Sequence, residues 1–73
     1  MSVINYSTAK KLVLADLRKT MKTLPVAERE RPRYMINNIP YSILDLIAAI
    51  ERDTTEGKKQ VFDRAKYLGY VVK

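Results

Sequence analysis

All three prolines of the chain lie within residues 25–40, and their position limits where helices can run. Proline lacks the N–H group that a helix interior needs, and the residue before a proline avoids the α region. Pro25, Pro32 and Pro40 therefore leave two proline-free segments, which an ordered but irregular connection should join. The alternating glutamates and arginines of residues 28–31 could add one helical turn to that connection.

The first predicted helix runs from Thr8 to about Thr23 and ends because Pro25 follows. Ser7 is the expected N-cap, since its hydroxyl can accept a hydrogen bond from a free N–H of the first turn. Apolar residues recur on one helical face at Leu14, Leu17, Met21 and Leu24.

Two further helices are predicted after the connection. The second begins near Pro40, which is acceptable at a first helical position, and its apolar residues are Ile43, Leu46, Ile47 and Ile50. The third opens with Asp53 and Glu56 as a capping box and ends at Gly69 in the left-handed region. Its inward stripe is Val61, Ala65 and Leu68.

Two β segments lie at opposite ends of the chain, at residues 3–6 and 70–72. Since neither has another partner, the sequence predicts an α+β fold, with three helices and a two-stranded ribbon of the N- and C-terminal segments. Residues 1–73 should form one small domain. The outer ribbon edges could accept a strand from another chain, although small sheets commonly have edges without this role. The edge residues are Val3, Ile4, Tyr6, Tyr70 and Val72.

The composition argues against catalysis, metal binding and cofactor binding. The chain has no cysteine and no histidine, which removes the usual zinc ligands and most nucleophile–base pairs. The carboxylates are scattered, and several are explained as helix caps or surface charges: Asp45, Glu51, Asp53, Glu56 and Asp63. No apolar run is long enough to span a bilayer, and the N-terminus has no signal pattern. We expect a cytoplasmic monomer with no membrane contact, which acts by binding.

The positive charge is unevenly distributed and suggests an anionic partner. The net charge is +6, with a balance of +5 in residues 1–34 and +1 in residues 35–73. The first predicted helix is strongly basic and is the candidate for proximity to DNA or RNA, against the alternative of an ordinary solvated face. Its basic residues are Lys10, Lys11, Arg18, Lys19 and Lys22.

The connection contains a second candidate surface, RERPRY followed by YMINNIPY. In an extended chain its three arginines would share one face, and arginine pairs well with carboxylate and phosphate. The interleaved glutamates and the adjacent apolar residues favour a protein contact over a phosphate clamp. The alternatives are a solvated loop and closure of the core. The candidate partner-binding residues are Arg29, Arg31, Arg33, Tyr34, Met35 and Tyr41.

The tail TTEGKKQVFDRAKYLGYVV resembles the third helix of lactose-repressor-type helix-turn-helix domains, which implies binding to DNA. In those domains the preceding helix reads DNA with polar side chains, whereas SILDLIAAIERD is apolar here.

In size, basic charge and lack of cysteine and histidine, the whole chain is similar to small phage-encoded regulators that bind bacterial RNA polymerase. That resemblance implies docking on the polymerase, hindrance of the promoter-specificity factor or of promoter opening, and prevention of termination. A polymerase-binding regulator is the leading hypothesis, a small DNA-binding protein the second, and an assembly module without nucleic acid the third.

Overall fold

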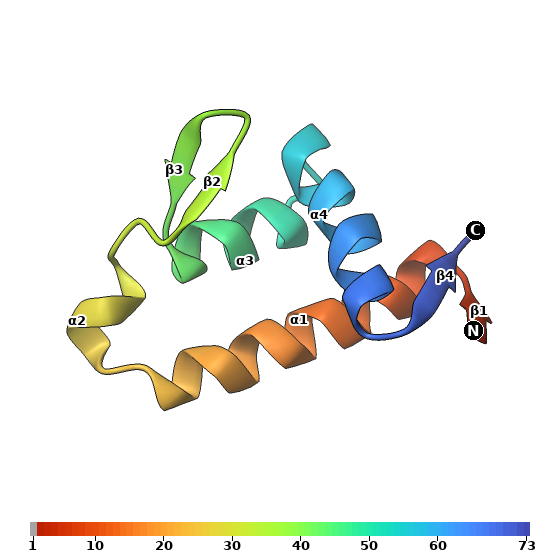
Figure 1. Ribbon diagram of the computed structural model, residues 1–73, viewed down its shortest axis with the longest axis horizontal. Coiled ribbons are helices and arrows are strands. Elements are labelled where there is room, and N and C mark those ends of the chain that lie inside the picture. Colours follow the sequence, from red (N-terminus) through yellow and green to blue (C-terminus); the bar gives the residue numbers. More distant parts are fainter. Residues whose placement is uncertain (1) are drawn as a thin grey trace.

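The computed structural model describes residues 2–73 and has the predicted α+β class (Figure 1). Its elements in chain order are β1 (Ser2–Ile4), α1 (Tyr6–Thr23), α2 (Val26–Arg29), β2 (Tyr34–Ile36), β3 (Ile39–Tyr41), α3 (Ile43–Glu51), α4 (Thr55–Tyr67) and β4 (Tyr70–Val72). The three predicted helices correspond to α1, α3 and α4. The one-turn helix α2 and the β2–β3 pair lie in the connection.

The predicted ribbon of the two termini is confirmed, and its strands are parallel. Ser2 pairs with Tyr70, and Ile4 pairs with Val72. Parallel neighbours need a long crossover, and here the rest of the chain supplies it. The prediction that Tyr6 belongs to the ribbon edge is wrong. Asn5, rather than Ser7, caps α1 by accepting from the Thr8 amide at 2.8 Å, so Tyr6 is already helical.

The expectation of an irregular connection is wrong for residues 34–41, which form a β-hairpin. Asn37 and Asn38 have φ angles of 51° and 64°, which a two-residue loop between antiparallel strands requires and asparagine tolerates. Pro40 therefore lies in β3 and does not start a helix. Instead α3 begins after Ser42, whose hydroxyl accepts from the Asp45 amide, while Asp45 accepts from the Ser42 amide.

The turn between α3 and α4 also differs from its prediction. The N-cap of α4 is Thr54, whose hydroxyl accepts from the Gly57 amide at 3.0 Å. Asp53 lies one residue earlier, at a left-handed φ of 53°, so its side chain is free to contact α1. At the other end of α4, Gly69 has the predicted left-handed conformation, with φ of 92°.

The core lies where α1, α3 and α4 meet. The largest fully buried side chains are Leu17, Ile43, Leu46, Ile50, Val13 and Val61. Leu68, predicted to face inward, is the C-cap residue of α4 and is 40% exposed. The hairpin and α2 lie at one end of the molecule, and the ribbon of the termini lies at the other (Figure 1). The hairpin and the ribbon edges, both candidate contact regions, are therefore separated in space.

Candidate functional site

The three arginines of RERPRY have different environments. Val26–Arg29 is helical, so the extended chain expected to align the arginines does not exist there. Arg29 is half-buried, and its Nε donates to the Leu24 carbonyl oxygen at 3.2 Å. Arg31 and Arg33 both approach the Glu28 carboxylate, at 3.3 and 3.8 Å, and their side chains are 70% and 47% exposed. Arg29 therefore has a local structural role, and Arg31 and Arg33 are accessible to a partner.

The hairpin has an inner face that closes the core and an outer face that is solvent-exposed. Ile36 is buried, and the paired residues Tyr34 and Tyr41 pack against the core cluster. Met35 pairs with Pro40 on the opposite face and is 69% exposed. Core closure and partner contact were alternative predictions for this stretch. In the structure, alternate residues of β2 contact the core or face solvent, so both alternatives hold for part of it.

Arg33 directly precedes β2 and is accessible at the start of the hairpin. Its amide donates to the Tyr41 carbonyl oxygen at 3.0 Å, which is one residue out of the register in which Tyr34 pairs with Tyr41, so Arg33 lies beside the hairpin but outside its regular ladder. Its side chain is 47% exposed next to the hairpin. We call Arg31, Arg33, Met35 and Pro40 the hairpin patch. Ile39 pairs with Ile36 and so belongs to the inner face, although at the hairpin tip it is 51% exposed.

Two of the five basic residues of α1 are engaged in ion pairs with the end of α3 and the following turn. Lys10 Nζ lies 3.0 Å from Asp53 Oδ1 and donates to the Glu51 carbonyl oxygen at 3.3 Å. Arg18 Nη2 lies 3.1 Å from Glu51 Oε2. Lys11, Lys19 and Lys22 are exposed, and no ion pair involves them within residues 2–73. The predicted nucleic-acid-proximal helix therefore offers three accessible lysines.

Asp53 is the centre of a cluster with Lys10 and Tyr6. The Tyr6 hydroxyl donates to Asp53 Oδ1 at 2.9 Å. Hydrogen bonds from Lys10 and Tyr6 lower the pKa of the Asp53 carboxyl, while burial and the contact with Asp53 raise the pKa of Tyr6 to about 12. The Tyr6 ring also lies 5.9 Å from the Phe62 ring. This cluster joins the start of α1 to the α3–α4 turn.

The proposed strand edges are partly accessible. Val3 is 57% exposed, whereas Ile4, Tyr70 and Val72 pack partly against the core. Each strand of the parallel pair has one neighbour, so each retains an open edge.

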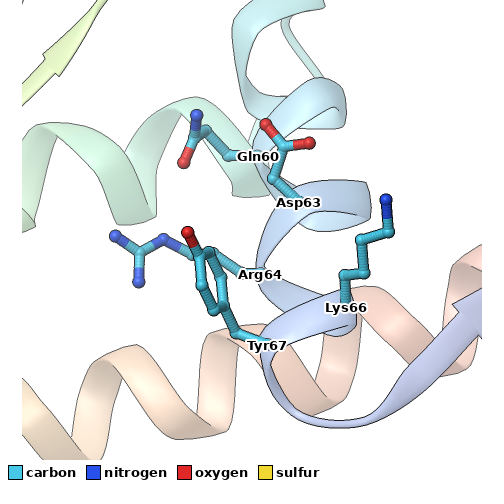
Figure 2. Close-up of a pocket in the computed structure, with 5 residues that line it drawn as sticks. All are labelled: Gln60, Asp63, Arg64, Lys66 and Tyr67. Carbon is cyan, nitrogen blue, oxygen red and sulfur yellow. The ribbon is translucent and has the colours of Figure 1, made fainter.

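Sequence reasoning missed a depression beside α4, with a volume of about 510 Å³. We call it the α4 depression, and its lining residues are Gln60, Asp63, Arg64, Lys66 and Tyr67 (Figure 2). The Arg64 guanidinium carbon lies 4.9 Å from the centre of the Tyr34 ring of the hairpin. The spacing i, i+3, i+4 and i+7 from Gln60 to Tyr67 was the available signal, since it marks one polar face of α4.

Within residues 2–73, no set of three carboxylates comes close enough together to hold a metal ion. Among the helices of that range, none combines the length and apolar character that crossing a membrane requires.

Comparisons with protein-family models, with curated proteins and with solved structures gave no match to this chain. Its functional interpretation therefore depends on the surfaces described above and on the resemblances of its sequence.

Proposed function

We propose that this protein is a small transcription regulator that binds bacterial RNA polymerase by protein–protein contact. In this proposal it inhibits initiation by hindering the promoter-specificity factor, and it also prevents termination. It would act in the cytoplasm of the bacterial host. The observation that carries the proposal is the hairpin patch, where exposed arginines adjoin exposed apolar side chains.

The chemistry of the hairpin patch suits a protein partner better than free nucleic acid. Interfaces combine an apolar centre with a polar rim, and arginine is enriched in them. Met35 supplies exposed apolar surface, and Arg31 and Arg33 supply charge. The Glu28 carboxylate lies 3.3 and 3.8 Å from the two arginines and would repel a phosphate backbone approaching the same point. A partner with an acidic, partly apolar surface is therefore favoured.

The choice of polymerase as that partner comes from the resemblance of the whole chain to small phage-encoded regulators. A net charge of +6 would steer the protein toward an acidic polymerase surface and speed the encounter. Inhibition by docking needs no reactive group, which is consistent with a chain without histidine or cysteine.

The direct test is retention of purified bacterial RNA polymerase on the immobilised full chain. The hairpin variant is Arg31→Ala/Arg33→Ala/Met35→Ser. Its matched control, Lys11→Ala/Lys19→Ala/Val3→Ser, also removes two exposed cations and one exposed apolar side chain. We expect the wild-type chain and the control to retain polymerase and the hairpin variant to lose it.

No retention by the wild-type chain would overturn the proposal. Equal loss in both triple variants would show that general positive charge, rather than the hairpin patch, makes the contact. With retention established, promoter-dependent transcription and read-through at a terminator measure the two proposed effects on the polymerase.

A small DNA-binding protein is the second candidate, because α3 and α4 form a helix pair joined by a short turn. Asp53 adopts a left-handed conformation in that turn, and α4 crosses α3 steeply (Figure 1). Against it, α3 takes the place of the DNA-reading helix in the resemblance to helix-turn-helix domains, and its side chains are mostly apolar and buried in the core. A gel shift of free duplex DNA with a steep salt dependence would favour this candidate.

A further inference from the structure

Arg64 has hydrogen-bonding capacity that the fold leaves unused. Its Nε is buried and has no hydrogen-bond partner. The two terminal guanidinium nitrogens make no hydrogen bond or ion pair with residues 2–73, and neither of them is a buried unpaired atom. They therefore reach solvent. A guanidinium with a covered inner nitrogen and two accessible outer nitrogens can bind an acid only through its outer end.

The surroundings hold this guanidinium in a defined place. Its carbon lies 4.9 Å from the centre of the Tyr34 ring, so the hairpin supports one side of it. Arg64 and Tyr67 extend from the same side of α4, and Lys66 extends from the other (Figure 2). Tyr67 is 91% exposed, so its ring contributes little to the core and is free to cover a ligand.

We propose that the α4 depression binds a single carboxylate, the side chain of a glutamate or aspartate in an acidic segment of the partner protein. The two outer nitrogens of Arg64 would bind the two carboxylate oxygens end-on, while the Tyr67 ring packs against the adjoining methylene groups. The inference rests on the proposed function only in taking the partner to be a protein. It adds a second contact point, which touches the hairpin at Tyr34.

A carboxylate fits this site better than a phosphate. Asp63 lines the same depression, and its negative charge opposes a phosphate dianion more strongly than a singly charged carboxylate. A planar carboxylate also matches the planar guanidinium with two parallel hydrogen bonds. An arginine and a tyrosine that share a pocket are the residue types that contribute most at protein interfaces.

The test is a titration of the isotope-labelled full chain followed by NMR of backbone amides and arginine Nε–Hε groups. The ligands are a blocked tetrapeptide with one glutamate, the same peptide with glutamine, and inorganic phosphate. The variants are Arg64→Met and Lys59→Met, since Lys59 is an exposed cation on the same helix that does not line the depression. A third variant, Asp63→Asn, is expected to strengthen peptide binding, whereas Arg64→Met is expected to abolish it.

We expect the glutamate peptide to cause saturable shifts centred on Gln60, Arg64 and Tyr67, and the glutamine peptide to cause none there. Arg64→Met should abolish these shifts, Lys59→Met should leave the apparent Kd within about two-fold, and Asp63→Asn should tighten it. Saturation by phosphate without saturation by the glutamate peptide would overturn the proposal. Shifts that spread equally over all cationic surfaces, or that persist in Arg64→Met, would also overturn it.

The peptide titration does not involve polymerase, so its result is separable from that of the proposed function. A chain that binds the glutamate peptide and fails to retain polymerase would keep this site and lose the proposed function. A chain that retains polymerase and does not bind the peptide would keep the proposed function and lose this site.

Discussion

The ammonium group of Lys10 donates to both carboxylate oxygens of Asp53, each at 3.0 Å, across a separation of 43 residues. This contact fixes α1 against the turn between α3 and α4. A lysine predicted to lie near nucleic acid therefore supports the fold, whereas its neighbour Lys11 is exposed to solvent.

Replacement of Lys10 and Lys11 should separate these roles. Lys10→Met removes a half-exposed ion pair, and we expect the melting temperature to fall by about 2–4 °C. Lys11→Met should change it by less than about 1 °C, because Lys11 has no ion pair within the described residues. Thermal unfolding followed by circular dichroism at low salt measures both. Equal melting temperatures for the two variants would contradict a structural role for Lys10.

Alkaline pH should weaken the contact of Tyr6 with Asp53. Burial and the Asp53 carboxylate raise the pKa of Tyr6 to about 12, from 10.0 in the unfolded chain. The folded state thus keeps a proton that the unfolded state releases, so stability falls as pH rises from about 10 through 12. Urea unfolding of the wild-type chain and Tyr6→Phe between pH 8 and 11.5 measures this. The advantage of the wild-type chain should shrink above pH 10, and a constant difference would refute the assignment.

Gly57 should tolerate no side chain, because α3 and α4 approach each other there. A Cβ atom at this position would overlap the carbonyl oxygen of Ala49. We expect Gly57→Ala to lower the free energy of unfolding by about 3 kcal/mol. At Gly69 a Cβ atom would meet nothing within 4 Å, and only the left-handed φ opposes alanine, at about 1 kcal/mol. Chemical denaturation should show a larger loss of stability for Gly57→Ala than for Gly69→Ala. The reverse order would show that α3 and α4 can move apart at little energetic cost.

Arg29 should behave differently from Arg31 and Arg33. Arg29→Ala removes the half-buried hydrogen bond to the Leu24 carbonyl, so we expect a loss of about 1 kcal/mol in stability and unchanged partner binding. Arg31→Ala/Arg33→Ala should leave the melting temperature within about 2 °C and weaken polymerase binding about ten-fold. Unfolding and equilibrium binding measured on the same samples test both. Weak binding by Arg29→Ala at full stability would place Arg29 in the interface.

The hairpin shows why part of the fold escaped prediction. Pro40 was expected at the start of a helix, because proline is favoured there, and residues 34–41 lack a strong strand period. The Asn37–Asn38 dipeptide was the local signal for a two-residue turn, and the Ser42–Asp45 capping box marked the true start of α3. Both signals are short, and the apolar spacing of Ile43 to Ile50 outweighed them.

The candidate site was also only partly predictable, because some of its residues are identified by tertiary contacts rather than by local sequence. Exposure of Met35 follows from local sequence, since one side of a hairpin must face solvent. Arg64 and Tyr67 were not singled out, because a charged residue on a helix ordinarily belongs to a solvated surface. The placement of Arg64 over the Tyr34 ring and its buried, unpaired Nε distinguish this arginine from its neighbours, and both arise from tertiary contacts.

The sequence by itself determined the three main helices, the β segments at both termini and the absence of cysteine and histidine chemistry. These features depend on apolar spacing, turn residues and composition, which are local properties. The tertiary structure decided that the ribbon is parallel and that Lys10 and Arg18 form ion pairs. It also decided that the Nε of Arg64 is buried without a hydrogen-bond partner. Those outcomes depend on which side chains meet across α1, α3, α4 and the hairpin, and such contacts exist only after the helices have packed.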